Sequence, residues 1–88
     1  MVTVTDVPTL IAESCRWREE LTLENQGAVI LYYGDTENVS TTGTRTGRLL
    51  GAGNWIKFTR TLDPNDVVKH VWGICVGGAT TTIKVVED

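Results

Sequence analysis

Residues that commonly carry catalysis or hold metals are scarce in this sequence. It contains one histidine and two cysteines among 88 residues. His70 has no serine or cysteine nucleophile beside it, so the sequence gives no support for a catalytic triad. Cys15 and Cys75 lie far apart along the chain, and with a single histidine they give no zinc-binding spacing. We therefore expect no enzyme activity, no metal and no cofactor, and we interpret His70 as a half-buried strand residue.

Long apolar runs are also absent. No stretch approaches the roughly 20 apolar residues of a membrane span. Met1 to Leu10 lacks the apolar run of a secretory signal. These absences predict synthesis in a reducing cytoplasm, with Cys15 and Cys75 as buried free thiols. A disulfide between the two cysteines stays open as an alternative if the protein later meets an oxidising medium.

Positive charge is in short supply as well. Eight Lys and Arg stand against eleven Asp and Glu, which gives a net charge of −3. Nucleic acid is a poor partner for such a chain, because a phosphate-binding surface needs a basic patch. A membrane is not expected as a partner either. The glycine-rich segment 43–53 lacks the Gly-Lys-Ser/Thr ending of a phosphate loop.

The residues that are plentiful favour strands. Threonine and valine recur throughout, several segments alternate between apolar and polar residues, and turn signals follow at intervals of about 8–12 residues. This pattern predicts an all-β protein, a small β-sandwich or jelly-roll-like barrel of about six to seven antiparallel strands. Residues 1–14 are expected as an N-terminal arm or edge strand, and residues 15–88 as a single β-sandwich domain.

Individual strands are expected from the alternation. In Cys15 to Leu23 it places Cys15, Trp17, Leu21 and Leu23 on one buried face. The later strands are expected at Ala28–Tyr33, which should be buried on both faces, near Val39, at Trp55–Arg60, at Val67–Val76 and at Thr80–Val86. Gly77-Gly78 predicts a tight hairpin between the last two strands.

Several side chains are candidates for contact with a partner. Arg45 and Arg48 lie in a glycine-rich loop, where they are either solvated or paired with carboxylates on a partner. Trp55 is out of register with the apolar face of its strand, so it is either an exposed anchor or an aromatic ring covered by a loop. Trp17 and Trp72 are in apolar register and are expected in the core. In Gly-Asp-Thr-Glu-Asn, Asp35, Glu37 and Asn38 are interpreted as turn residues rather than calcium ligands.

Four segments in order give the sequence a family resemblance. They are ENQGAVILYYGD, VSTTG, LLGAGNWIKF and VWGICVGGATTTIKVVED. Together they cover about residues 15–88, and they resemble a small β-module of tailed-phage virion proteins, of the capsid decoration (cement) or head-fibre type. The matching positions are Asn25, Gly27, Tyr33, Gly34, Gly43, Leu50, Gly53 and Thr81. These modules have no active site, so the resemblance transfers no functional residue.

The resemblance implies a structural protein on the capsid surface of a virion, made in the host cytoplasm. Its expected partners are the major capsid protein and further copies of itself, with a homotrimer as one possible assembly. Val2 and Val4 of the N-terminal segment are expected to add a strand to a neighbour's open sheet edge. A fibre- or tail-associated receptor or carbohydrate module, using Trp55 with Asp35 and Asn38, remains an alternative.

Overall fold

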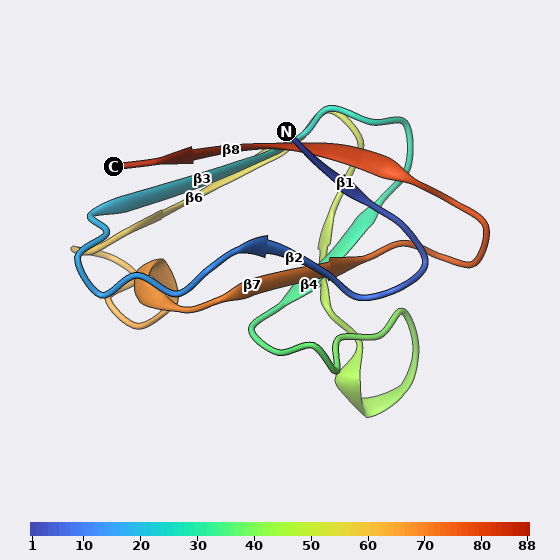
Figure 1. Ribbon diagram of the computed structural model, residues 1–88, viewed down its shortest axis with the longest axis horizontal. Coiled ribbons are helices and arrows are strands. Elements are labelled where there is room, and N and C mark those ends of the chain that lie inside the picture. Colours follow the sequence, from blue (N-terminus) through green and yellow to red (C-terminus); the bar gives the residue numbers. More distant parts are fainter.

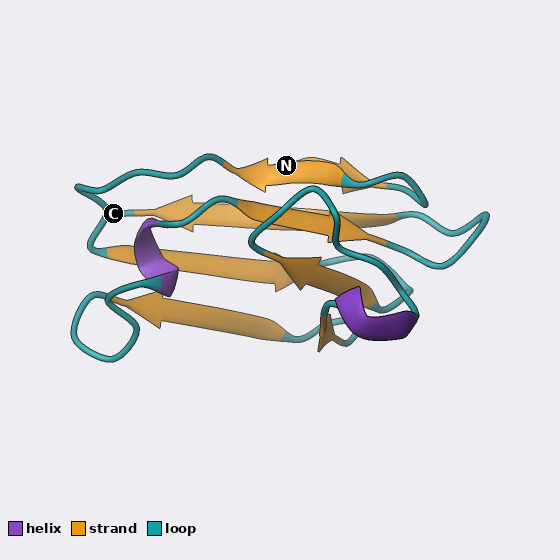
Figure 2. Ribbon diagram, turned by 90° about the horizontal axis from the view of Figure 1, so that it is seen from below, coloured by secondary structure: helices purple, strands orange, loops and turns teal.

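Eight strands form two open, four-stranded sheets that pack face to face, as the computed structural model of residues 1–88 shows (Figure 1). The strands are β1 (Val2–Val4), β2 (Thr9–Ala12), β3 (Glu20–Asn25), β4 (Leu31–Gly34), β5 (Arg48–Leu50), β6 (Trp55–Thr59), β7 (Val71–Ile74) and β8 (Thr81–Glu87). Two short 3-10 turns, η1 (Gly43–Arg45) and η2 (Asp66–Val68), lie at opposite ends of the sandwich (Figure 2).

The strand order is that of a jelly roll. Sheet A has the order β1-β8-β3-β6 and sheet B the order β2-β7-β4-β5, and every neighbouring pair is antiparallel. The first strand pairs with the last, the second with the seventh, the third with the sixth and the fourth with the fifth. A long antiparallel ribbon rolled into two layers gives this pairing. The predicted small β-sandwich is thus confirmed, with open sheets rather than a closed barrel and with eight strands.

The N-terminal segment belongs to the sandwich itself. β1 forms one edge of sheet A and β2 forms one edge of sheet B. Of the two expectations for residues 1–14, the structure contains edge strands and no free arm. The physical reason is burial, because Val4, Ile11 and Ala12 all lie in the core. A register shift between Leu10 and Ala12 kinks β2, as is common at sheet edges.

Four predicted strands differ from the structure. The strand expected at Ala28–Tyr33 begins only at Leu31 and buries alternate side chains on one face, not both. The strand expected at Val67–Val76 begins only at Val71, because η2 takes up Asp66–Val68, and His70 is exposed and in no strand.

The other two differences concern the segment before β3 and the segment around Val39. Residues 15–19 form a loop, and β3 begins only at Glu20. In this loop Trp17 is 77% exposed and Cys15 is also exposed, so the prediction that both are buried is wrong. Val39 is buried as an anchor but belongs to no strand. Gly77-Gly78 connects β7 in sheet B to β8 in sheet A, so it closes no hairpin.

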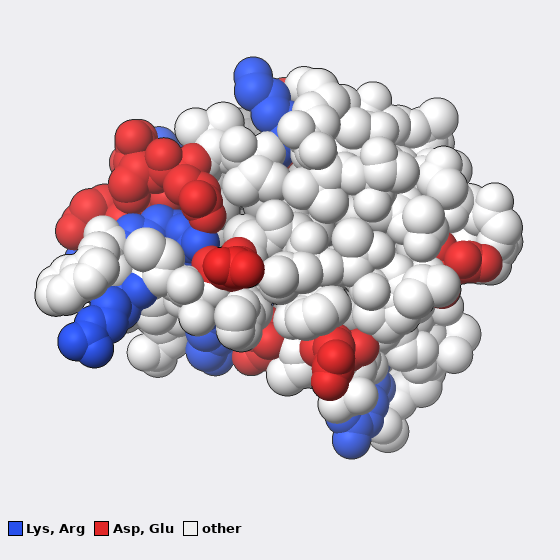
Figure 3. Space-filling model, in the orientation of Figure 1, with Lys and Arg blue, Asp and Glu red and all other residues white.

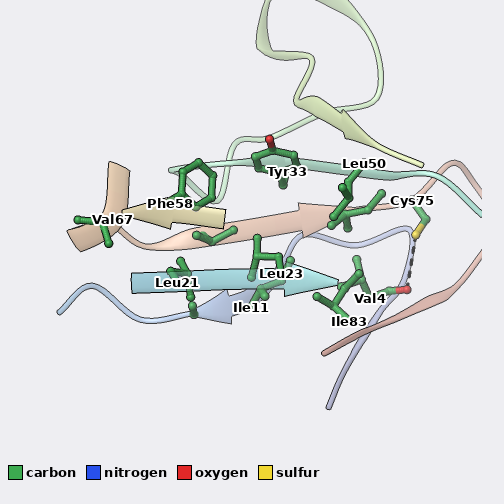
Figure 4. Close-up of a cluster of buried hydrophobic side chains, with 13 residues drawn as sticks. Val4, Ile11, Leu21, Leu23, Tyr33, Leu50, Phe58, Val67, Cys75 and Ile83 are labelled. Carbon is green, nitrogen blue, oxygen red and sulfur yellow. Dashed lines mark hydrogen bonds between the residues drawn. The ribbon is translucent and has the colours of Figure 1, made fainter. Parts of the chain in front are cut away.

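The core lies between the sheets and contains 13 buried residues (Figure 4). Leu21, Leu23 and Ile83 come from sheet A, and Leu31 and Tyr33 come from sheet B. The rings of Tyr33 and Phe58 meet edge to face across the layers, with 6.4 Å between centroids. Alternation along each strand sends every second side chain into this core, which is the pattern that the sequence predicts for Leu21 and Leu23.

One buried polar side chain joins several strands at the end of the sandwich. Asn25 is fully buried, and its Nδ2 donates hydrogen bonds to the carbonyl oxygens of Val29 (2.8 Å) and Leu50 (2.9 Å). Its Oδ1 accepts from the N–H of Gly27 (3.1 Å) and from the hydroxyl of Thr81. Its side-chain donors and its acceptor oxygen therefore all form hydrogen bonds, which offset the cost of removing this amide from water.

Gly27 completes the arrangement because no side chain fits at its position. A Cβ atom there would lie 1.9 Å from the Thr81 hydroxyl oxygen. The main chain of Asn25 also bonds to the turn between β5 and β6, by accepting from Gly53 N–H at 2.8 Å. Gly53 has a φ of 77°, which favours glycine. We call Asn25, Gly27, Gly53, Leu50 and Thr81 the Asn25 cluster.

Replacing Asn25 by Ala should lower the free energy of unfolding by about 3 kcal/mol. The buried carbonyl oxygen of Leu50 and the partly buried one of Val29 would both lose their donor. Urea unfolding followed by tryptophan fluorescence measures this change. The exposed Asn38, whose side chain makes no hydrogen bond, supplies the control Asn38→Ala, expected within about 0.5 kcal/mol of the parent. Equal unfolding midpoints for the two variants would contradict this account of Asn25.

Candidate functional site

The outer faces of the two sheets have opposite character. On sheet B the outward side chains include Leu10, Tyr32, Leu49, Trp72 and Ile74, which we call the apolar sheet B face. Register places them side by side, with Tyr32 between Leu49 and Ile74, and with Leu10 opposite Trp72. None of the five belongs to the buried core or packs against it, so the prediction that Trp72 lies in the core is wrong. Leu49 is 62% exposed.

The outer face of sheet A is polar by contrast. β3 presents Glu20, Thr22 and Glu24 there, and Lys57 of β6 forms an ion pair with Glu20 at 3.2 Å. Its larger apolar side chains are Trp55, opposite Glu24, and Val86, opposite Thr22. The molecule therefore has one sheet surface suited to water and one suited to contact.

The edge formed by β1 and β2 extends the uncharged surface. Among residues 1–12 only Asp6 carries a charged side chain. Figure 3, viewed as in Figure 1, shows an uncharged expanse across β1 and β2 with charged groups at its margins. Leu10 belongs both to this edge and to the apolar sheet B face. The uncharged surface thus continues from one side of the sandwich to the next.

A hollow of about 360 Å³ opens beside β5, and we call it the β5 hollow. Tyr33 and Phe58 contribute apolar lining from the core. Its polar lining comes from three stretches of chain, with the side chains Asp35, Thr36, Asn38, Arg45, Thr46, Arg48, Asp66, Lys69 and His70. Strand β5 has only three residues, and its first, Arg48, pairs with Tyr33. The two lie on the same face of sheet B, the face turned toward the hollow.

Val39 positions the loop that forms one wall of the β5 hollow. Its buried side chain packs close to Gly34 and Gly47. Ser40 N–H donates to the Arg45 carbonyl (2.9 Å), and Gly47 N–H donates to the Ser40 carbonyl (2.8 Å). A Cβ at Gly47 would come within 2.8 Å of backbone atoms of Tyr33, so only glycine lets the loop approach β4. This loop brings Arg45 to the same hollow as Arg48.

Charges around the β5 hollow are partly paired. Lys69 forms an ion pair with Asp35 at 3.4 Å. Arg45 and Arg48 have no carboxylate oxygen within the 4.0 Å of an ion pair. His70 accepts a hydrogen bond at Nδ1 from Ser14 N–H at 2.9 Å, so the neutral ring carries its proton on Nε2. No serine or cysteine nucleophile lines the hollow beside His70.

Burial raises the pKa of the Tyr33 hydroxyl above its ordinary value of 10.0. The positive charge of Arg48 and a hydrogen bond from it oppose this effect, and the negative charge of Asp66 adds to it. Tyr33 therefore stays protonated through the neutral range, and its hydroxyl remains a hydrogen-bond donor.

The structure separates the residues that the sequence selected as contact candidates. Arg45 and Arg48 lie together at the β5 hollow, and Asp35 and Asn38 line it too. Trp55 is 63% exposed but lies outside this hollow, so it does not join Asp35 and Asn38 in one site.

The expected role of Val2 and Val4, strand addition at a neighbour's sheet edge, stays a prediction, because β1 is an edge strand of sheet A. Their side chains are not available for contact in the same way. Val4 is fully buried, because alternation along β1 points it into the core, and its side chain is closed to a partner. Val2 is half-buried and packs against the core. Sequence reasoning did not select Leu10, Tyr32, Leu49 and Ile74, which the register of sheet B brings together on one face. Their alternation with buried neighbours was the available signal.

No three His, Cys, Asp or Glu side chains lie close enough together to hold a metal ion. The chain contains no helix with the length and apolar character needed to cross a membrane. Comparison with known proteins finds no matching family model, no matching curated protein and no matching solved structure.

The raised pKa of Tyr33 predicts a loss of stability in alkali. The unfolded chain releases the Tyr33 proton near pH 10, whereas the folded chain retains it, so this contribution to stability is present below about pH 10 and is lost at higher pH. Tyr33→Phe should remove it. We expect the variant to lose less free energy of unfolding than the parent between about pH 9 and about pH 11, measured by urea titrations at each pH. Identical slopes for both proteins would contradict the assignment.

Proposed function

We propose that this protein is a structural subunit of a virus particle, a decoration (cement) protein that binds the outer surface of a tailed-phage head and stabilises the shell. The observation that carries the proposal is the unequal character of the two sheets. A sandwich with an apolar outer face on sheet B and a polar outer face on sheet A is suited to lie on a larger body with sheet B inward. The resemblance to phage virion modules suggests that this larger body is the capsid of a tailed phage.

The jelly-roll connectivity also supports this function. The same double-sheet arrangement occurs in viral capsid domains and in lectins. A fold alone does not define a function, so the connectivity counts as an analogy beside the surface. Small size adds a physical argument. A domain of 88 residues buries a modest part of its surface, and docking on a shell would add burial that the monomer lacks.

The expected partners are the major capsid protein and further copies of this chain. Covering Leu49, which is 62% exposed, is worth at most roughly 1.5–3 kcal/mol. The other four residues of the apolar sheet B face are already partly buried, so each adds less. Self-association at the uncharged β1–β2 edge would bring copies together on the shell, and a trimer is one arrangement that fits a lattice.

A recognition module at a fibre or tail is the second candidate. The β5 hollow favours it, since Asp35 and Asn38 stand there beside Tyr33 and two arginines. Jelly-roll lectins provide the analogy for such a role.

The copy number of the protein in purified virions tests the leading proposal. Quantitative mass spectrometry against the major capsid protein should give roughly equal numbers for a lattice-covering decoration protein. A few copies per particle would favour the fibre or tail module instead. Complete absence from virions would reject both.

The docking face can be tested by charge insertion. Leu49→Glu places a carboxylate on the apolar sheet B face and should reduce binding to heads that lack the protein by about tenfold or more. Val86→Glu is the matched control, because Val86 is an exposed apolar residue of sheet A and should leave binding unchanged. Cosedimentation with purified heads measures both variants. Equal binding of the Leu49→Glu variant and the parent would reject sheet B as the docking face.

A further inference from the structure

The β5 hollow has an excess of positive charge in a protein whose net charge is negative. Pairing of Lys69 with Asp35 leaves two arginines, Arg45 and Arg48, against the single carboxylate of Asp66. Neither arginine is in an ion pair. Elsewhere on the molecule Arg18 and Arg60 each pair with a glutamate. The exposed Arg16 is unpaired too, but it lies outside the hollow, so Arg45 and Arg48 are the two unpaired arginines that share one concave site.

A neutral donor stands beside the two guanidinium groups. Tyr33 is almost wholly buried, yet its hydroxyl points away from the other core side chains, toward the loop that carries Arg45 (Figure 4). Tyr33 also pairs across the strands with Arg48. The two side chains therefore reach the hollow from adjacent strands that the sheet holds in register, which is the rigid placement that a binding site needs.

We infer that the β5 hollow binds a carboxylate group, with Arg45 and Arg48 as its cationic partners and the hydroxyl of Tyr33 as a hydrogen-bond donor. The planar guanidinium group of arginine matches a carboxylate with two parallel hydrogen bonds. A volume of about 360 Å³ lies at the small end of ligand pockets, and so fits one side-chain-sized group.

The net charge of the hollow favours one class of anion. With Lys69 paired to Asp35, the two arginines and the single carboxylate of Asp66 leave one net positive charge. A singly charged carboxylate balances this charge, whereas a doubly charged phosphate would exceed it beside the Asp66 carboxylate. Two sources carry this chemistry, namely an acidic side chain of a polypeptide partner and the carboxylate of a sugar acid.

NMR titration of the isolated, isotope-labelled protein tests the inference with four probes: N-acetylglutamate α-amide, glucuronate, inorganic phosphate and chloride. We expect at least one of the two carboxylates to bind with a dissociation constant on the order of 1 mM, and to shift the Nε signals of Arg45 and Arg48. The probe that binds more tightly distinguishes a peptide source from a sugar source. Failure of both carboxylates to bind, or tighter binding of phosphate, would overturn the inference.

Variants identify the residues responsible. Arg45→Gln, Arg48→Gln and Tyr33→Phe should each weaken carboxylate binding by about tenfold. Arg16→Gln makes the same change of charge at an exposed arginine outside the hollow, beside Trp17, and should bind as the parent does. Equal weakening by Arg16→Gln would mean that overall charge, and no site, attracts the anion. Because Arg45 and Arg48 are exposed, their variants should fold, and the shifts in the parent protein give a readout that needs no variant.

This inference does not rest on the proposed place of the protein in a virion. The titration uses the isolated chain, so a protein absent from virions could still bind carboxylate, and a virion protein could fail to do so. The copy-number measurement and the titration therefore test the two proposals independently of each other.

Discussion

The hydrogen bonds of the buried Asn25 amide are the constraint on which the arrangement of the two sheets depends. Asn25 ends β3 of sheet A, and its side chain reaches Leu50 at the end of β5 in sheet B and Thr81 at the start of β8. The five residues of the Asn25 cluster are all among the eight positions on which the expected resemblance to a phage module is based. In this structure those five positions close one end of the sandwich, so a structural requirement is enough to account for them.

At the other end of the sandwich, the buried charge of Arg18 also connects separate segments of the chain. Arg18 is 4% exposed, and its guanidinium donates to the carbonyls of Glu13, Val67 and Lys69 and pairs with the Glu87 carboxylate. It thereby ties the loop after β2 to the η2 turn and to the end of β8. Alternation within 15–23 placed Arg18 outward and Trp17 inward, and the structure reverses both. A local pattern could not predict this, because two of the three carbonyls that bond to Arg18, those of Val67 and Lys69, lie 49 and 51 residues away along the chain.

The sequence predicted features that depend on neighbouring residues along the chain, such as which side chains of a strand are buried. It missed features that depend on how the strands fold into two sheets. Ile56 with Phe58, and Val71 with Cys75, fall on the faces that alternation assigns them. The Gly77-Gly78 turn was misread because every connection except that between β4 and β5 passes from one sheet to the other. The β5 hollow shows the same division. Arg45 and Arg48 could be selected as exposed arginines, but their meeting with Tyr33 depends on the register of β4 with β5 and on the buried anchor Val39.

Strand β5 joins the two surfaces for which roles are proposed. Its adjacent residues Arg48 and Leu49 point to opposite sides of sheet B, the first into the β5 hollow and the second onto the apolar sheet B face. On the neighbouring strand β4, Tyr33 likewise points toward the hollow and Tyr32 onto the apolar sheet B face. The register of β5 with β4 therefore fixes both surfaces at once, because it sets the side of sheet B to which each of these side chains points. A slip of one residue would exchange the two faces, placing Leu49 in the hollow and Arg48 on the apolar sheet B face.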